Sequence, residues 1–441
     1  MSRQLFGTDG VRGRAGEFLT AELALALARA AVELSGDQHP QVLIVRDTRE
    51  SCEMLEAATA AGVTAAGGDA LLAGVLPTPA APLLLRRHGL RMAVVISASH
   101  NPYEDNGIKF FAADGFKLSD ETEAAIENRI DIPAAPPSRI GRVRSLHGAL
   151  EDYLRELHTR FQELDLSGRR ILLDCANGAT HRAAPEIFRR LGAHVDVIAD
   201  QPDGRNINDG VGSTHIERLR EQMSAGDHDA GFAFDGDGDR VLAVDADGVV
   251  VDGDELIAIA AKHLKRTGAL NGGGVAVTVM TNYGFHTAMR EAGIEVATTA
   301  VGDRYVNEAL RSRGWRLGGE QSGHIIDLGF GPSGDGIGSA LLTLEALAGG
   351  RLHERTAMVK LPQKLVNIRA ASRERLSQAM ESTAVREAIQ AAEQTLSGRG
   401  RVLVRVSGTE PLIRVMVEAP SLEETERICS DLGATVESAL A

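Results

Sequence analysis

Cysteine is scarce in this sequence: 441 residues include only three, Cys52, Cys175 and Cys429. They lie far apart and form no CxxC pair, which excludes a disulfide framework and the common zinc-binding motifs. Reduced thiols are typical of cytoplasmic proteins. Long apolar runs are also missing, because the most apolar helical stretch, residues 21–34, contains charged residues and falls short of the roughly 18 apolar residues of a membrane span. The first residues lack the apolar core of a signal peptide, so we expect a cytoplasmic protein that does not span a membrane.

Positive charge is in deficit, and the formal net charge is −14. This negative net charge argues against non-specific binding to nucleic acids and against binding to an anionic membrane surface. An anionic small-molecule substrate would therefore need a local concentration of cations. Aromatic residues make up only 4% of the chain, whereas glycine occurs 48 times. That combination is typical of α/β proteins with many tight turns between strands and helices.

Short apolar runs recur along the chain, and each is followed by a polar or glycine-rich turn and then by a helical pattern. Residues 169–192 and 274–293 are two such strand–turn–helix units. Apolar strands that alternate with helices predict parallel sheets covered on both faces. At roughly 100–200 residues per domain, a chain of this length forms two to four domains.

Two stretches indicate domain boundaries: the proline-rich residues 131–139 and residues 360–370. Residues 241–253 predict a hairpin that turns at Asp247–Gly248. Residues 401–418 have a strand–loop–strand pattern that differs from the preceding units. We predict three similar α/β domains with mixed, mostly parallel sheets and a C-terminal α+β domain, with these ranges: 1–155, 156–254, 255–364 and 365–441.

The first of four polar loops follows the apolar run 93–96 and contains Ser97, Ser99, His100 and Asn101. Such residues are common in turns, so a purely structural turn is one interpretation. The other is a nucleophilic serine exposed at the carboxyl end of a parallel strand, where open α/β sheets place their sites. A base or a metal would have to activate it. The Gly-x-Ser-x-Gly elbow of hydrolases is absent, which disfavours a hydrolase triad.

The second loop alternates aspartate with glycine and contains Asp235, Asp237 and Asp239. The glycines let the backbone fold tightly, so that three carboxylates can converge on one point. All-oxygen ligation suits a hard ion such as Mg²⁺. An EF-hand loop begins in the same way but needs glycine at its sixth position and glutamate at its twelfth. Arg240 and Ala246 occupy those positions, which excludes an EF-hand and leaves a structural acidic turn as the alternative.

The third loop, residues 318–324, contains Glu320, Gln321, Ser322 and His324 among glycines that allow close approach of a ligand. These side chains suit sugar hydroxyls or an amine. An ordinary polar loop is the alternative interpretation.

The fourth loop combines hydroxyls, backbone N–H groups and guanidinium groups, in Arg405, Ser407, Gly408, Thr409 and Arg414. Such groups form phosphate cradles, although a tight hairpin with surface arginines would have the same composition. Together the four loops supply a nucleophile, a hard-metal site, a hydroxyl-binding loop and a phosphate cradle. Phosphoryl transfer to and from a phosphosugar needs that set.

These motifs resemble those of the α-D-phosphohexomutases. Ser-Ala-Ser-His-Asn-Pro at 97–102, Asp-Gly-Asp-Gly-Asp-Arg at 235–240 and Arg-x-Ser-Gly-Thr-Glu-Pro at 405–411 follow the order of that family, and FGTDGVRG at 6–13 matches its N-terminal signature. The resemblance covers essentially the whole chain. It implies a four-domain, heart-shaped enzyme around a central cleft.

The resemblance also implies a mechanism in which Ser99 is a phosphoserine. Phospho-Ser99 would give its phosphoryl group to O1 of glucosamine 6-phosphate, and the resulting 1,6-bisphosphate would reorient and return its 6-phosphoryl group to Ser99. Glucosamine 1-phosphate would remain, for UDP-N-acetylglucosamine and peptidoglycan synthesis. One Mg²⁺ ion would be held by Ser99 with Asp235, Asp237 and Asp239. Glucosamine 1,6-bisphosphate or a similar compound would act as primer, and the family allows a homodimer.

Further roles follow from the same resemblance. Arg12 and Arg240 would add positive charge beside the reacting phosphate, and His100 would help to orient Ser99. Lys109 and His324 match family positions for proton transfer, and as a base Lys109 would need a lowered pKa. The residues expected to bind substrate are Arg240, Gly302, Asp303, Arg304, Glu320, Ser322, Arg405, Ser407, Gly408, Thr409 and Arg414. A surface ion pair between Asp303 and Arg304 is the alternative for those two.

The predicted substrate depends on one residue, Gln321. Glutamine is typical of the branch that acts on glucosamine phosphates, whereas branches for glucose or mannose phosphates more often have methionine or glutamate at this position. The same chemistry on those sugars is therefore one alternative. A second is a metal-dependent phosphomonoesterase that uses Ser99 and releases free phosphate. A third is a phosphosugar-binding protein without catalysis, which would be expected to lose Ser99 or a metal aspartate. Cys52 and Glu53 depart from the glycine and proline expected at those positions.

Overall fold

The computed structural model describes residues 5–7, 9–133, 136–370, 372–407 and 411–440. The chain divides into two compact units. The first comprises Met1–Met280 and Ile294–Arg355, and the second comprises Thr281–Gly293 and Thr356–Ala441. Within the described ranges, no helix has both the length and the apolar character to cross a membrane.

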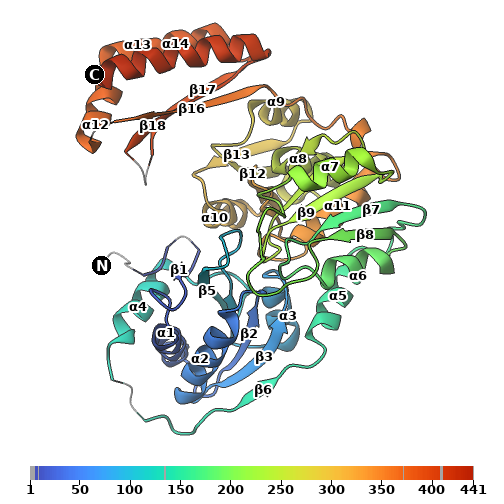
Figure 1. Ribbon diagram of the computed structural model, residues 1–441, viewed down its shortest axis with the longest axis vertical. Coiled ribbons are helices and arrows are strands. Elements are labelled where there is room, and N and C mark those ends of the chain that lie inside the picture. Colours follow the sequence, from blue (N-terminus) through green and yellow to red (C-terminus); the bar gives the residue numbers. More distant parts are fainter. Residues whose placement is uncertain (1–4, 8, 134–135, 371, 408–410, 441) are drawn as a thin grey trace. The chain divides into compact units, whose positions relative to one another are not determined.

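The first sheet of the first unit has six strands (Figure 1). In spatial order they are β1 (Val11–Arg14), β5 (Asp105–Ala112), β4 (Met92–Ile96), β2 (Gln41–Arg46), β3 (Asp69–Val75) and β6 (Val143–Ser145). Strands β4, β2, β3 and β6 are parallel to one another, whereas β5 runs antiparallel to both β4 and β1. The sheet is therefore parallel except at the edge that carries β5 and β1.

Four helices belong to this sheet: α1 (Ala21–Glu33), α2 (Cys52–Ala65), α3 (Ala80–His88) and α4 (Asp120–Ile130). Helices α1, α2 and α4 share one apolar core with Val42 and Ile44 of β2. A Cβ atom at Gly62 would lie 2.3 Å from Leu25 O, so the missing side chain lets α1 and α2 pack closely. Because side chains alternate along a strand, Leu43 and Val45 face the other side, where α3 contacts the sheet.

The second and third sheets of this unit follow the same plan. The second sheet has, in order, β11 (Val250–Val251), β10 (Val241–Asp245), β9 (Ala230–Phe234), β7 (Arg170–Asp174) and β8 (His194–Ile198), with α5 (Ala149–Arg160), α6 (Ala183–Arg190) and α7 (Glu217–Ala225). The third has β13 (Glu295–Thr299), β12 (Gly274–Thr278), β14 (Leu317–Gly319) and β15 (Ile325–Asp327), with α8 (Gly253–Arg266), α10 (Asp303–Arg313) and α11 (Gly336–Leu347). Helix α11 contacts β9 and β10 as well as β15, so it joins the two sheets. Short 3₁₀ turns lie at Asn271–Gly273 and Leu352–Glu354.

The second unit contains one antiparallel sheet, in the order β16 (Gln363–Arg369), β18 (Leu412–Glu418) and β17 (Arg401–Val406). Its helices are α9 (Tyr283–Glu291), α12 (Arg373–Glu381), α13 (Thr383–Leu396) and α14 (Leu422–Leu440). The buried carboxylate of Glu418 accepts hydrogen bonds from the backbone N–H of Tyr283, at 2.8 Å, and from Arg401, at 3.0 Å. The bond from Tyr283 links the start of α9 to β18 of the small sheet.

The predicted fold class is confirmed: three α/β domains with mixed sheets precede a C-terminal α+β domain. The strand–turn–helix units at 169–192 and 274–293 and the hairpin at Asp247–Gly248 are also present. The domain boundaries at 155, 254 and 364 remain predictions.

A buried carboxyl group at the start of α11 makes stability dependent on pH. Asp335 caps this helix by accepting from Gly338 N at 2.8 Å, and the Tyr153 hydroxyl donates to its two oxygens at 3.1 and 3.0 Å. Burial raises the pKa of Asp335 to about 6. A raised carboxyl pKa means that the fold favours the neutral form. The stabilising contribution is therefore complete below the unfolded pKa, near 4, and is lost as the pH rises through about 6.

We predict that Asp335→Asn is stabilised relative to the wild type as the pH rises from 4 to 7, by up to about 3 kcal/mol in the free energy of unfolding. Asparagine keeps the capping oxygen but has no proton to lose. Thermal unfolding across this pH range measures the difference. The exposed Asp114, which accepts from Phe116 N in a similar turn, gives the control Asp114→Asn, and equal pH profiles for the two variants would contradict the prediction.

Candidate active site

Three of the four polar loops lie in the first unit, and each joins two neighbouring antiparallel strands. The serine loop (97–104) joins β4 to β5, and the aspartate loop (235–240) joins β9 to β10. The first two residues of the predicted third loop belong to β14, and its remaining residues, 320–324, join β14 to β15. Neighbouring antiparallel strands can be connected directly, without a crossover helix. The general pattern of strand, turn and helix therefore does not hold at these loops, which are anchored by a sheet at both ends.

Ser99 lies at the centre of the serine loop and is fully buried. Its Oγ donates a hydrogen bond to Asp235 Oδ2 at 2.5 Å and lies 3.4 Å from His100 Nδ1. The expectation of an exposed serine is wrong, because the aspartate loop covers it. Ser99 also has a backbone φ of 54°, in the left-handed region that costs a non-glycine residue roughly 1–2 kcal/mol. Strain of this kind persists only where the surrounding structure holds it.

The three aspartates of the second loop converge, as predicted. Asp235, Asp237 and Asp239 each offer a carboxylate oxygen within 4.8 Å of the others, and all three are buried. Burial and repulsion by Asp239 and Asp237 raise the pKa of Asp235 well above its usual range. Within the described part of the chain, Asp237 Oδ1 and Asp239 Oδ1 have no hydrogen-bond partner. Buried carboxylate oxygens that accept no hydrogen bond and carry like charge are suitable ligands for a hard metal ion. These residues can therefore bind a metal.

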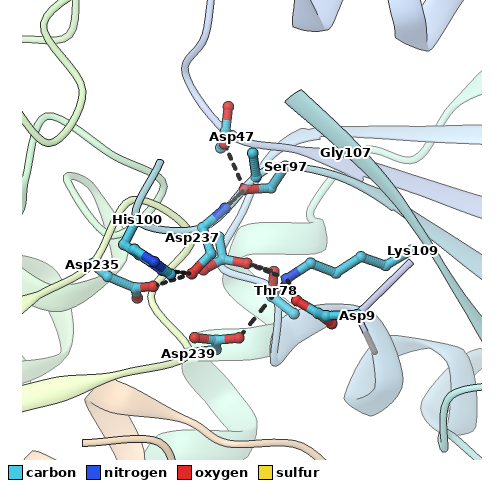
Figure 2. A network of polar contacts seen from close by, with 12 residues as sticks. Asp9, Asp47, Thr78, Ser97, His100, Gly107, Lys109, Asp235, Asp237 and Asp239 are labelled. Carbon is cyan, nitrogen blue, oxygen red and sulfur yellow. Dashed lines mark hydrogen bonds and ion pairs between the residues drawn. The ribbon is translucent and has the colours of Figure 1, made fainter. Parts of the chain in front are cut away.

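Lys109 provides the buried positive charge beside this cluster. Its Nζ lies 2.8 Å from Asp237 Oδ2 and 3.1 Å from Asp9 Oδ2. Figure 2 shows Lys109 and Asp9 on one side of Asp237, with Asp235 and His100 on the other. Burial alone would lower the pKa of Lys109, but the carboxylates of Asp237 and Asp9 outweigh it, and the pKa is raised. The lowered pKa that a general base requires is therefore not found, and Lys109 is an ammonium group in this arrangement.

Two arginines bring further positive charge. Arg12, on β1, forms an ion pair with Asp9 and donates to Ala98 O at 3.3 Å, next to the serine. Arg240 closes the aspartate loop, and its backbone N–H donates to Asp235 Oδ1 at 3.2 Å. Burial and these two arginines lower the pKa of His100 to about 4, so that the imidazole beside Ser99 is neutral at pH 7.

His324 brings the third loop into contact with the aspartate loop. Its Nδ1 lies 3.6 Å from Asp239 Oδ1, and its Nε2 lies 3.8 Å from Asp303 Oδ2. Burial by itself would lower the pKa of His324, but Asp239 and Asp303 raise it to about 9. Glu320 accepts a hydrogen bond from Gly302 N at 2.9 Å, which holds the third loop against the start of α10.

A cavity of about 440 Å³ opens beside these groups. Its lining includes most of the residues predicted for this unit: Arg12, His100, Asp239, Arg240, Gly302, Asp303, Glu320 and His324. Gln321 and Ser322 are not among the described residues that line it. Gln321 instead donates to Asp252 Oδ2 at 3.3 Å, and Ser322 is exposed. The residue that indicated the sugar therefore does not face this cavity.

Asp303 and Arg304 do not form the surface ion pair that was the alternative interpretation. Asp303 lies 2.6 Å from Lys117 Nζ, and Lys117 also pairs with Asp9. Arg304 instead pairs with Glu123 at 3.0 Å, on α4. Only Asp303 of the two lines the cavity beside Ser99, so a direct role in binding is better supported for Asp303 than for Arg304.

The residues predicted to form the phosphate cradle belong to the second unit. Arg405 on β17 is the cross-strand neighbour of Arg414 on β18, and the buried Ser407 begins the loop between the strands. Gly408 and Thr409 lie outside the described residues. Because cross-strand neighbours lie on the same face of a sheet, these two arginine side chains share one face beside the loop.

Sequence reasoning did not predict three residues that hold the serine loop and the aspartate loop in place: Asp47, Arg49 and Thr78. Ser97 Oγ donates to Asp47 Oδ2 at 2.6 Å and accepts from Ser99 N at 3.0 Å. Thr78 Oγ1 donates to Asp237 Oδ2 at 2.7 Å. The buried Arg49 donates to Ser99 O at 2.9 Å. Charged residues directly after β2, the parallel neighbour of β4, were the signal available, because the ends of neighbouring parallel strands lie together.

A buried serine beside converging carboxylates, with a cavity whose lining includes two arginines, is typical of an enzyme of phosphoryl transfer on α/β domains. Four sequence models described as phosphoglucomutase/phosphomannomutase match the chain: alpha/beta/alpha domain I at residues 3–134, domain II at 151–248, domain III at 252–365 and the C-terminal domain at 365–434. The chain belongs to this family, the α-D-phosphohexomutases.

Curated relatives that match over nearly the whole chain bear a more specific name, phosphoglucosamine mutase. The phosphoglucosamine mutase of Caldicellulosiruptor bescii is 46% identical, over 99% of this chain and 99% of the relative. That of Pelotomaculum thermopropionicum is 49% identical, over 97% and 98%. The resemblance inferred from the motifs is therefore confirmed over nearly the whole chain.

Solved structures share the fold. A phosphoglucomutase/phosphomannomutase family protein of Burkholderia thailandensis has a TM-score of 0.81 at 24% identity, covering 100% of this chain and 98% of that one. The Aspergillus fumigatus N-acetylphosphoglucosamine mutase, solved in complex with GlcNAc-6P and magnesium, has a TM-score of 0.70 at 18% identity, covering 99% and 96%.

We predict that Mg²⁺ raises the melting temperature of the wild type and that Asp235→Asn abolishes most of this shift. A ligand at one hundred times its Kd stabilises the folded state by about 2.7 kcal/mol. Asparagine keeps an oxygen for the Ser99 hydroxyl and removes one of three repelling charges, so the metal-free variant should be at least as stable as the wild type. Differential scanning calorimetry with and without Mg²⁺ measures both quantities. Asp247→Asn, at an exposed turn outside the site, is the control, and an unchanged shift in Asp235→Asn would contradict the assignment.

Proposed function

We propose that the protein is a phosphoglucosamine mutase, which interconverts glucosamine 6-phosphate and glucosamine 1-phosphate. The observation that carries the proposal is the contact of 2.5 Å between Ser99 Oγ and Asp235, within a buried carboxylate triad. The chain also matches all four family domains in order, and its curated relatives bear this name.

In the proposed reaction, the O1 oxygen of glucosamine 6-phosphate attacks the phosphorus of phospho-Ser99. The bond from phosphorus to Ser99 Oγ breaks as the bond to O1 forms, and the proton of the O1 hydroxyl passes to the departing Ser99 Oγ. The bisphosphate then reorients in the site, and Ser99 Oγ attacks the phosphorus of its 6-phosphoryl group. The bond from phosphorus to O6 breaks as the bond to Ser99 Oγ forms, the serine proton passes to O6, and glucosamine 1-phosphate leaves. Because Ser99 ends in its starting state, the net reaction is an isomerisation.

One Mg²⁺ would be held by Asp235, Asp237 and Asp239 together with an oxygen on Ser99. When bound, a divalent ion offsets the charge of the transferring phosphoryl group. The unpartnered oxygens of Asp237 and Asp239 support this assignment.

The cations of the chain add to that effect. Arg12 and Arg240 line the cavity and would lie near the equatorial oxygens of the reacting group, where developing charge is best stabilised by fixed donors. Lys109 is protonated, so its proposed role is to donate a hydrogen bond or a proton rather than to accept one. His324, with a pKa of about 9, is likewise suited to giving a proton to a sugar oxygen.

Carboxylates on the cavity wall support an aminosugar. Asp303 and Glu320 line the cavity, and an amine with a pKa near 8 is largely protonated at pH 7. A glucosamine ammonium group would be attracted to these carboxylates, whereas the C2 hydroxyl of glucose or mannose would gain less. The proposed discrimination therefore depends on charge at the wall and not on Gln321.

The remaining parts of the proposal concern groups beyond this cavity. Arg405, Ser407 and Arg414, with Gly408 and Thr409, would bind the phosphate that is not reacting. A sugar bisphosphate such as glucosamine 1,6-bisphosphate would phosphorylate Ser99 initially. We also propose that the enzyme acts in the cytoplasm, as a monomer or a homodimer.

We predict that the purified protein with Mg²⁺ and a bisphosphate primer converts glucosamine 6-phosphate into an anomeric phosphate. Conversion should be faster than with glucose or mannose 6-phosphate. Phosphorus NMR distinguishes the three products directly. Ser99→Ala should lose conversion entirely, whereas Ser145→Ala, at an exposed serine on β6, should keep it. Faster conversion of glucose or mannose 6-phosphate would mean that this sugar phosphate, and not glucosamine 6-phosphate, is the substrate. Release of inorganic phosphate would identify a phosphomonoesterase.

We also predict that Glu320→Gln raises the KM for glucosamine 6-phosphate by about tenfold, the size of one charge-assisted contact. The KM for glucose 6-phosphate should change little, because glutamine keeps the oxygen that accepts from Gly302 N. Initial rates on both sugars give the ratio. Glu308→Gln, an exposed residue on α10, controls for the change of charge, and equal effects on both sugars would contradict recognition of the amine by Glu320.

A further inference from the structure

Two backbone carbonyl groups of the serine loop each accept two hydrogen bonds from buried side chains. Arg49 Nη2 donates to Ser99 O and to Asn101 O, at 2.9 Å each. Asn208 Nδ2 donates to the same two oxygens, at 2.9 Å and 3.1 Å. We call these four hydrogen bonds the carbonyl clamp. Arg49 and Asn208 are both buried, so water does not compete for the two oxygens.

The clamp acts on the strained part of the loop. Ser99 has a left-handed backbone, and its carbonyl direction depends on that conformation. If the backbone relaxed to negative φ, the Ser99 carbonyl would turn away from both donors, and the hydroxyl would leave Asp235. Buried donors without acceptors are costly. The clamp therefore opposes relaxation and holds Ser99 Oγ at the carboxylate triad.

Asn208 comes from the second α/β domain, between β8 and α7, whereas Arg49 and the serine loop belong to the first. Its own backbone is left-handed, with φ of 59°, and its N–H donates to Ala176 O at 3.0 Å. The aspartate loop meets the clamp as well, because a Cβ atom at Gly236 would lie 2.6 Å from Ser99 O and 2.7 Å from Asn208 Nδ2. Three separate segments are thus fixed against one carbonyl group.

We propose that Asn208 is a positioning residue for the nucleophile: with Arg49 it fixes the backbone of Ser99 so that Oγ faces the triad. The proposal rests on the proposed function, in which Ser99 carries the phosphoryl group. The side-chain amide of Asn208 donates to two backbone carbonyl groups of the serine loop, so we assign it no group in the reaction. Its effect is on the rate of transfer and not on the binding of the sugar.

Asn208 is the better of the two residues for a test. Arg49 also pairs with the buried Asp47 at 2.9 Å and donates to Asp105 O at 3.0 Å, so its loss would leave a buried carboxylate without its partner and disturb the fold. Asn208→Gly removes only the amide, and glycine tolerates the left-handed backbone. Asn208→Asp keeps the shape but sets carboxylate oxygens against two carbonyl oxygens.

The matched control is Asn206→Asp, the same change two positions away. Asn206 is half-buried and donates to Gln201 O within its own loop, at 2.9 Å. The three variants and the wild type would be compared in kcat and KM for glucosamine 6-phosphate, in melting temperature, and in the rate at which dephosphorylated Ser99 gains a phosphoryl group from glucose 1,6-bisphosphate, followed by intact-protein mass.

We expect Asn208→Gly and Asn208→Asp to lower kcat and the phosphoryl-uptake rate about a hundredfold, the effect of a displacement near 1 Å at a reacting atom. KM should stay within about twofold of the wild type, and Asn206→Asp should match the wild type. The proposal is overturned if both Asn208 variants keep wild-type kcat, or if their activity falls only in proportion to the unfolded fraction. A wild type that takes up phosphoryl groups at Ser99 without isomerising glucosamine phosphate would refute the proposed function, and the uptake rates would still decide the role of Asn208.

Discussion

The buried ammonium group of Lys109 is the interaction on which the candidate active site depends. Carboxylates from the N-terminal segment and from the aspartate loop approach one point, and burial makes each of them costly to keep charged. Lys109 Nζ lies 2.8 Å from Asp237 and 3.1 Å from Asp9, so it offsets this charge and joins the two segments. One lysine does not balance the whole cluster, since oxygens of Asp237 and Asp239 still have no donor among the described residues. The remaining imbalance of charge fits a triad that can bind a metal ion better than a purely structural acidic turn.

The loops hold these charges in place because each is anchored by antiparallel strands. The serine loop, the aspartate loop and the third loop each leave one strand and enter its neighbour in the same sheet. A loop tied at both ends has few conformations to lose when it orders. Contacts between the loops, such as that of Ser99 with Asp235, can therefore be kept at a defined geometry without crossover helices. The same plan recurs in the second unit, between β17 and β18.

Sequence reasoning succeeded where the signal is local and failed where it depends on distant partners. The Asp-Gly alternation predicted the convergence of Asp235, Asp237 and Asp239, and alternating strands and helices predicted the fold class. The raised pKa of Lys109 was not predictable, because it is set by Asp9 and Asp237, which lie 100 and 128 positions away along the chain. Burial of Ser99 was missed for the same reason, since the covering loop belongs to another domain. The orientation of Gln321 toward Asp252 likewise depends on how the third loop packs on α8.

Burial of Ser99 bears on the choice between a mutase and a phosphomonoesterase. A mutase must keep its phosphoryl group on the serine or on the sugar while the bisphosphate turns over, and water at the phosphorus would end the cycle as free phosphate. Exclusion of water from a reactive group is one means of preventing such side reactions. Ser99 is fully buried, beneath Asp235 and beside a neutral His100. A hydrolase would instead need a water molecule aligned opposite Ser99 Oγ, and burial of Ser99 beneath Asp235 disfavours that water. The surroundings of Ser99 thus favour transfer to a sugar hydroxyl over transfer to water.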